Sequence, residues 1–137
     1  MLYHIKESIV PISFCDEVIK QGENKEISKA KIQEGNKANR SSDVSWLDEE
    51  KLGTSLTNLV IIANRESGWN YSLKEFEPLQ YTIYKKDDFY DWHIDSHNNP
   101  YDNGMVRKLS FTLCLNEDYE GGSCLLYTSD AADDTLC

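Results

Sequence analysis

The sequence lacks most of the features that mark membrane, secreted or nucleic-acid-binding proteins. No apolar run approaches the roughly 18–20 residues of a membrane span, and the N-terminal stretch has no apolar core of the kind found in a signal peptide. The chain has 14 basic residues against 24 acidic ones, so its net charge is −10, which disfavours binding to nucleic-acid phosphates. We therefore expect a cytoplasmic protein that binds neither membranes nor nucleic acid.

Cysteine is scarce and is not spaced for metal binding. None of the four cysteines lies in a Cys-x-x-Cys pair, which excludes a zinc knuckle and a thioredoxin-type motif. Because there is no secretory signal, we expect reduced thiols rather than a disulfide scaffold. Apolar residues make up 39% of the 137 residues and charged residues 28%, which is the composition of one globular domain.

Two segments have apolar residues at the spacing of 3–4 positions that is typical of amphipathic helices. The first begins after Pro11, with Ser13 as the expected N-cap, and ends at Gly22. The second covers residues 45–64, and we expect Gly53 to delay its start because glycine weakens a helix. Both segments lie in the N-terminal half of the chain.

The remaining pattern is that of short strands. Residues 26–32 alternate weakly, and residues 40–46 form a second candidate strand, with Trp46 expected to point inward. From Trp69 onward the period changes to two, which predicts strands at 79–84, 89–95 and 107–116. Helices followed by antiparallel strands favour an α+β fold.

The pair His93 and Asp95 is the clearest candidate for chemistry. On a strand, residues two apart face the same side at a spacing of about 6–7 Å, so one metal ion could lie between them. Two histidines and one carboxylate with open positions hold non-haem iron(II) in oxygenases. His97 continues the same face, but a flat strand would place it too far away, so we expect it in the following loop. An isolated pair of this kind can also be an incidental surface feature.

Four stretches in order carry a resemblance to a known family. They are Gln80-Tyr81-x-x-Tyr84, Tyr90-Asp-Trp-His93-Ile-Asp95, Arg107-Lys-Leu-Ser-Phe-Thr and Leu115-Asn-x-x-x-Tyr119-Glu-Gly-Gly122. In this arrangement the chain resembles the iron(II)- and 2-oxoglutarate-dependent oxygenases of the prolyl-4-hydroxylase-like branch. The resemblance is strong over residues 79–122. It implies N-terminal helices packed on an incomplete double-stranded β-helix, or jelly-roll, barrel.

The resemblance also implies roles for individual residues. His93 and Asp95 match the first two iron ligands, and Tyr84 and Tyr90 match aromatic residues of the 2-oxoglutarate pocket. Arg107 matches a residue near the mouth of the site, where it would meet substrate. Both tyrosines could instead be packing residues of a barrel, and Arg107 a solvated strand end. Trp92 is expected in the core or in the pocket wall.

One turn departs from the family pattern. Residues 85–89 read Lys-Lys-Asp-Asp-Phe, whereas relatives commonly have a glycine there. A left-handed turn conformation suits Asp87 or Asp88 less well than it suits glycine. The turn is therefore a mild departure from the family pattern.

The activity implied by the resemblance is hydroxylation of a peptidyl substrate, which includes prolyl groups, or of a small molecule. It would use iron(II), 2-oxoglutarate, dioxygen and ascorbate. The alternative is a non-catalytic β-barrel module that binds a metal or a small ligand. A folded interaction protein with an incidental His-x-Asp pair is a third interpretation.

The family needs a second histidine and a later basic residue, both downstream of Gly122. This sequence has no histidine after His97 and no lysine or arginine after Lys108. Residues 123–137, which contain Cys124 and Cys137, resemble the in-frame translation of a transposase-type sequencing adapter. We expect residues 1–122 to be the N-terminal part of the oxygenase domain, followed by a non-native tail. The 137-residue chain would then be inactive by itself.

Overall fold

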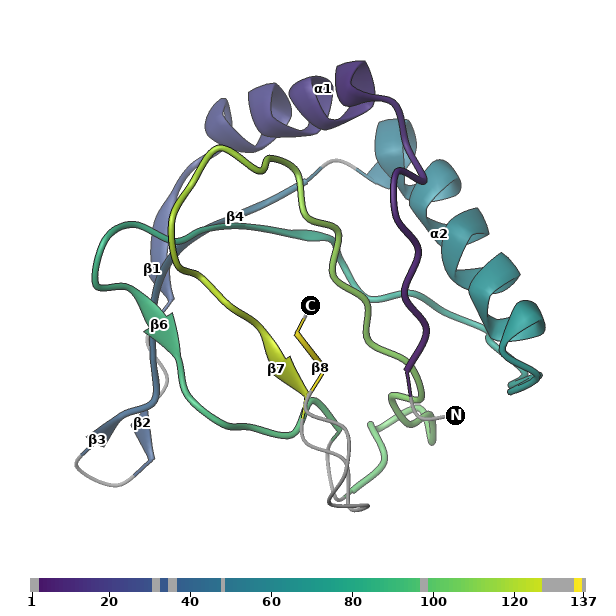
Figure 1. The fold of residues 1–137 in the computed structure, drawn as a ribbon. Helices are drawn as coiled ribbons and strands as arrows, with labels where there is room; N and C mark the ends of the chain where they lie inside the picture. The colour runs from purple at the N-terminus through teal and green to yellow at the C-terminus, as the bar shows by residue number, and fades with distance from the viewer. Residues whose placement is uncertain are drawn as a thin grey trace.

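The computed structural model describes residues 3–30, 33–34, 37–47, 49–96, 99–126 and 135–136. Two helices lie at the periphery, and the strands and the extended C-terminal half lie on their inner side (Figure 1). The fold is therefore α+β, as the sequence predicted. Neither described helix is long and apolar enough to cross a membrane.

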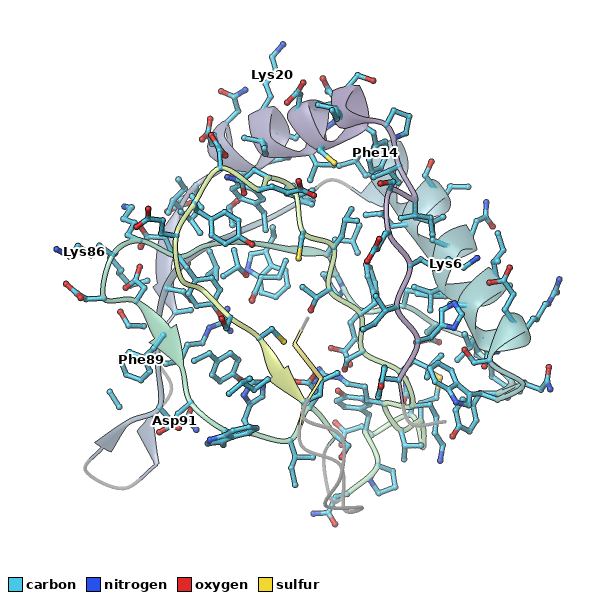
Figure 2. The ribbon with its side chains drawn as sticks, in the orientation of Figure 1. Lys6, Phe14, Lys20, Lys86, Phe89 and Asp91 are labelled. Carbon is cyan, nitrogen blue, oxygen red and sulfur yellow. The ribbon has the colours of Figure 1, made fainter. Side chains whose placement is uncertain are left out.

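Helix α1 (Ile12–Glu23) follows the extended residue Pro11, which occupies the N-cap position without a side-chain cap. Ser13 lies inside the first turn, so its prediction as the N-cap is wrong. Val18 is buried, and Phe14 and Ile19 pack against the same core, which confirms the predicted apolar face. Phe14 and the outward-pointing Lys20 mark the two sides of α1 in Figure 2.

Gly22 lies in the last turn of α1 rather than beyond it. A Cβ atom at this position would be 2.2 Å from Cδ1 of Tyr81, closer than any real contact. The carbonyl of Gly22 also accepts a hydrogen bond of 2.7 Å from Ser45 Oγ. Gly22 is therefore needed for the close approach of the helix to the sheet, in addition to any effect on the helix end.

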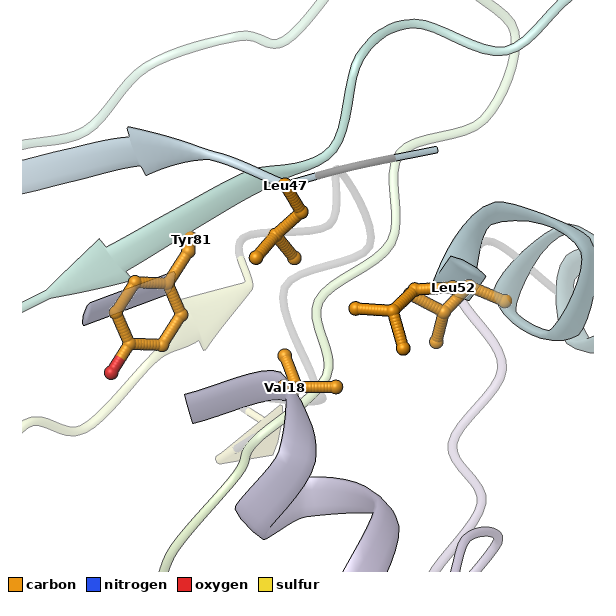
Figure 3. Close-up of a cluster of buried hydrophobic side chains, with 5 residues drawn as sticks. Val18, Leu47, Leu52 and Tyr81 are labelled. Atoms are coloured by element: carbon orange, nitrogen blue, oxygen red, sulfur yellow. The ribbon is translucent and has the colours of Figure 1, made fainter. Parts of the chain in front are cut away.

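Helix α2 (Glu49–Glu66) begins before Gly53, so the expected delay is wrong. Its predicted apolar stripe is confirmed, since Leu52, Leu56 and Val60 are buried. Leu52 belongs to the main core cluster with Val18 of α1 and Tyr81 of the sheet, and Val18 lies between the other two side chains (Figure 3). Leu47, which precedes the helix, completes this cluster. The core thus lies between the two helices and the sheet.

Strand β4 (Arg40–Trp46) is the centre of the sheet, at the bounds predicted from the sequence. It pairs antiparallel with β1 (Ser28–Ala30) and β5 (Gln80–Ile83). It also pairs antiparallel with β6 (Phe89–Tyr90). Trp46 is 51% exposed, so its expected inward orientation is wrong.

Residues 84–88, here called the excursion, connect β5 to β6. They do not form a hairpin, because both strands pair with β4. Both strands run antiparallel to β4, with Ile83 opposite Asp43 and Phe89 opposite Ser41. Residues 84–88 therefore leave and rejoin the same neighbouring strand. Asp87 in this excursion has a φ of 68°, which confirms the predicted left-handed position.

The C-terminal half is extended but forms few strands. Only Phe89 and Tyr90 of the predicted strand 89–95 belong to a ladder, and residues 105–119 belong to none. The predicted alternation is present only in part, because Leu109, Leu113 and Leu115 are half-buried whereas Phe111, which was expected on the same face, is 44% exposed. Residues 105–119 are thus extended chain with no strand partner among the described residues.

Two short two-stranded sheets complete the described structure. Strand β2 (Gln33–Glu34) pairs with β3 (Lys37–Ala38), and β7 (Leu125–Leu126) pairs with β8 (Thr135–Leu136). The described strands form small open sheets and no closed barrel. The origin of residues 123–137 stays a prediction.

Candidate functional site

The site is built on the segment that follows β6. Residues 91–96 bend instead of continuing as a strand. His93 Nε2 consequently lies 3.2 Å from Asp95 Oδ1, much closer than the spacing expected along a flat strand. The two side chains are therefore in contact, on a bend rather than on the predicted strand, and their role as metal ligands stays a prediction.

Two contacts fix the His93 ring. Its Nδ1 lies 2.8 Å from the carbonyl oxygen of Asp91, and the ring stacks on Tyr90 with centroids 3.5 Å apart and planes at 6°. A carbonyl only accepts hydrogen bonds, so Nδ1 must carry the proton. In the neutral ring, the free lone pair then lies on Nε2, the atom that faces Asp95.

This arrangement places two electron-rich atoms together. A neutral Nε2 and the carboxylate Oδ1 repel each other at 3.2 Å unless the imidazole gains a proton or a cation lies between them. Two ligand atoms held at right angles by metal bonds of about 2.1 Å would be about 3.0 Å apart. The observed separation fits that geometry, and a histidine whose other nitrogen binds a carbonyl is typical of metal sites. The same distance is also that of an ordinary His–Asp ion pair, so the contact is compatible with two cis metal ligands and does not by itself select them.

Arg107 holds the same segment from the other side. Its Nη1 donates to the carbonyl oxygen of Asp95 at 2.6 Å, while its Nε and Nη2 donate to the two carboxylate oxygens of Glu77. Glu77 also accepts from the Tyr101 hydroxyl at 2.8 Å. The hydrogen bond to Glu77 raises the pKa of Arg107 above its usual range. Arg107 thus connects the bend at Asp95 to residues 77 and 101.

Tyr84 and Tyr90, the predicted pocket aromatics, meet at Arg40. The Arg40 guanidinium carbon lies 4.7 Å from the centroid of the Tyr90 ring. Desolvation raises the pKa of the Tyr84 hydroxyl, and the neighbouring charge of Arg40 opposes that rise. The three residues come from β4, the excursion and β6, so the sheet register is what brings them together.

Sequence reasoning missed Arg40 altogether. The available signal was a charged residue at the start of a predicted strand, and the partner strand that buries it could not be identified locally. Trp92 differs from its expected place in the core or pocket wall, since it is 63% exposed. It therefore does not belong to the core.

No group of three metal-ligating side chains occurs among the described residues. His97, the residue weighed as a further ligand, lies outside them. A hollow of about 270 Å³ lies beside α2, lined by residues that include Thr57, Asn58, Phe76 and Glu77. Neither His93 nor Asp95 lines this hollow, so the hollow and the candidate metal ligands are separate features.

Comparison with known proteins adds no assignment. No protein-family model matches this chain, and neither the curated proteins nor the solved structures include a match.

Proposed function

We propose that this chain provides part of the active site of an iron(II)- and 2-oxoglutarate-dependent oxygenase of the prolyl-4-hydroxylase-like branch. His93 and Asp95 would be two of the three iron ligands. The observation that supports this most directly is the facing of Nε2 and Oδ1 at 3.2 Å, with Nδ1 already bound to a carbonyl. The third ligand and a basic residue that pairs with the cosubstrate would come from sequence beyond the described residues.

The neighbouring side chains would prepare this site. Tyr90 would keep the His93 ring in one orientation by stacking, and Tyr84 would offer its hydroxyl to 2-oxoglutarate. We assign Arg107 to holding the Asp95 segment, because its nitrogens already bind Glu77 and the Asp95 carbonyl. A direct contact of Arg107 with substrate would require its paired bonds to Glu77 to open.

The fold implied by the proposal is a jelly-roll barrel of which the open sheet is one part. Its support is the extended segment that holds the half-buried Leu109, Leu113 and Leu115, which would need a neighbouring strand to join a sheet. When bound, iron(II) would supply the oxidising chemistry with 2-oxoglutarate and dioxygen, and ascorbate would keep it reduced. The substrate would be a peptidyl group, such as a prolyl group, or a small molecule, in the cytoplasm.

The decisive experiment measures succinate released from labelled 2-oxoglutarate in the presence of iron(II) and ascorbate. We expect no turnover from the 137-residue chain, and turnover from a chain extended by its native downstream coding sequence. In the extended chain, His93→Ala and Asp95→Ala should abolish turnover. His4→Ala removes a histidine outside the site and should leave it intact. Full turnover after loss of His93 would overturn the proposal.

A second candidate function is a non-catalytic module that binds a metal or small ligand. The observation in its favour is that the described residues supply only two ligands. This module would bind cobalt(II) through His93 and Asp95 but would release no succinate even when extended. The same assay therefore separates the two functions.

A further inference from the structure

Residues 106–119 form an extended segment whose backbone has no strand partner. Their N–H and C=O groups make no backbone hydrogen bond with another described residue, and none of them belongs to a ladder. The structure describes this segment in full, and no residue in it has a positive φ, so no left-handed position interrupts its course. An extended chain with unpaired groups along its edge is a template for the addition of another strand.

The described strands do not provide that partner. They pair around β4, as β2 with β3, or as β7 with β8. The segment instead passes on the inner side of α1 (Figure 1), where Leu113 and Leu115 pack against the core cluster. Side-chain packing therefore holds the segment in place, and its backbone edge is left for a strand that is not among the described residues.

The segment has an inward and an outward face, because successive side chains of an extended chain alternate. The even-numbered residues 108–116 are all exposed, whereas Leu109, Leu113 and Leu115 are half-buried. Phe111 belongs to the inward face by this alternation but is 44% exposed. The core of the chain therefore covers the inward apolar face only in part.

The charges of the segment are opposite at its two ends. Arg107 and Lys108 lie near its start, and Glu117 and Asp118 lie near its end. Two antiparallel copies of the segment, related by a two-fold axis at Thr112, would place each basic end beside the acidic end of the other copy. A parallel in-register pair would place like charges together, which is unfavourable. The charge pattern therefore favours a second copy of the same segment in antiparallel orientation.

The same register matches the apolar positions. With Thr112 opposite Thr112, Leu109 lies opposite Leu115 of the second copy, and Phe111 lies opposite Leu113. All four positions belong to the inward face, so the second copy would cover the Phe111 ring that the first copy leaves exposed. Cross-strand pairs of this kind are what stabilises two neighbouring strands.

Neighbouring registers fit less well. A displacement by two residues would place Leu109 opposite Glu117 in one direction and Arg107 opposite Leu115 in the other. A displacement by one residue would place the apolar face of one copy opposite the polar face of the other. The register centred on Thr112 therefore satisfies the charged and the apolar positions together.

We propose that residues 107–117 form an interface through which two copies of this chain pair as antiparallel strands, with Thr112 at the two-fold axis. On the outward face, the exposed Lys108 would lie diagonally from Asp118 of the second copy, within reach of a long side chain. Among the described residues, Lys108 has one contact, in which its Nζ lies 5.8 Å from the centroid of the Tyr71 ring. Its charge is thus available to the second copy.

Sedimentation equilibrium of the 137-residue chain at micromolar concentration tests the pairing. We expect a species of twice the monomer mass of 15.8 kDa. Phe111→Thr removes the ring that faces the second copy but keeps a strand-forming residue, and it should weaken dimerisation by at least about tenfold. Phe89→Thr is the matched control, because Phe89 is 43% exposed and lies outside the segment. Its dimerisation should equal that of the wild-type chain.

An exchange of charges tests the orientation and separates pairing from folding. Lys108→Asp or Asp118→Lys alone places like charges beside each other twice in the symmetric pair, and each should weaken dimerisation by about tenfold. The double variant Lys108→Asp with Asp118→Lys restores opposite charges across the interface and should recover dimerisation. A misfolded single variant would not be rescued in this way.

Three results would each overturn the proposal. A wild-type chain that sediments as a monomer would show that the edge is covered within one copy. Large species of mixed mass would show unspecific aggregation. Dimerisation that is unchanged by Phe111→Thr, or that the double charge variant does not recover, would place the interface elsewhere.

Discussion

Arg107 donates from Nη1 to the backbone carbonyl of Asp95 at 2.6 Å, while Glu77 occupies the other side of the same guanidinium. The contact spans 12 residues of sequence and the pair with Glu77 spans 30. A paired guanidinium of this kind is rigid, because two parallel bonds fix its plane. The bend that brings Asp95 to His93 is therefore held from outside the bend itself.

The first prediction concerns the contact of Arg107 with the Asp95 carbonyl. Glu77→Gln removes the charge that orients Arg107, and should lower the cobalt(II) affinity of the His93–Asp95 pair by about tenfold, the usual effect of losing a partner of a metal ligand. The measurement is a cobalt(II) titration followed by its visible absorption. Glu75→Gln, which neutralises an exposed carboxylate two residues earlier, is the control. Equal affinities in wild-type and Glu77→Gln chains would show that Arg107 does not position Asp95.

The second prediction concerns the approach of α1 to the sheet. Gly22→Ala places a methyl group 2.2 Å from the Tyr81 ring and should lower the free energy of unfolding by about 1–3 kcal/mol. Urea unfolding is the measurement. Gly53→Ala in α2 is the matched control, and there we expect a gain of up to about 1 kcal/mol. In a Tyr81→Leu background the penalty of Gly22→Ala should shrink, and an unchanged penalty would place the strain elsewhere.

The features that could be predicted from the sequence were those determined by residues close together in the chain. The buried stripe of α2 follows from the spacing of Leu52, Leu56 and Val60 along one helix, and it was predicted correctly. The bounds of β4 were also predicted, because turn-rich sequence precedes it and the start of a helix follows it. The orientation of Trp46 was not, since it depends on which face of β4 the helices cover.

The same distinction between local and long-range causes applies to the candidate site. His93 and Asp95 were chosen from their spacing and from the family resemblance, and their role as metal ligands stays a prediction. Their 3.2 Å contact comes from a bend that no local pattern predicts. Arg40 was missed because its burial depends on pairing with residues about 40 positions away. Partner choice across the sheet was thus the part that sequence reasoning could not supply.

The third prediction concerns the excursion between β5 and β6. Asp87 has a φ of 68°, a conformation that is unfavourable for most side chains and that glycine adopts freely. Asp87→Gly should therefore raise the free energy of unfolding by up to about 1 kcal/mol, despite the added freedom of the unfolded chain. Lys86→Gly, at a neighbouring residue without a positive φ, should lower it. Urea denaturation of both variants gives the comparison, and a loss of stability in Asp87→Gly would contradict the strain.

The last prediction concerns Asp43, which is 4% exposed and is held between Lys29 of β1 and Lys85 of the excursion. Hydrogen bonds to these two lysines lower the pKa of Asp43 below its usual range. Its pKa in the folded chain is thus below the value of about 3.9 in an unfolded chain. The ion pairs stabilise the fold above that unfolded value, and the stabilisation is lost as the pH falls toward the folded pKa.

Asp43→Asn should accordingly lower the free energy of unfolding at pH 7. It should also reduce the loss of stability that the wild-type chain shows as the pH falls below 5. The measurement is the urea midpoint as a function of pH. Asp88 would remain in this variant, and its pKa is also lowered, first by Ser41 and then by the Lys85 backbone. Part of the acid slope should therefore persist. Asp16→Asn, on the exposed face of α1, should keep the whole wild-type slope. A profile for Asp43→Asn parallel to that of the wild-type chain would mean that the lysine pairs contribute nothing to acid unfolding.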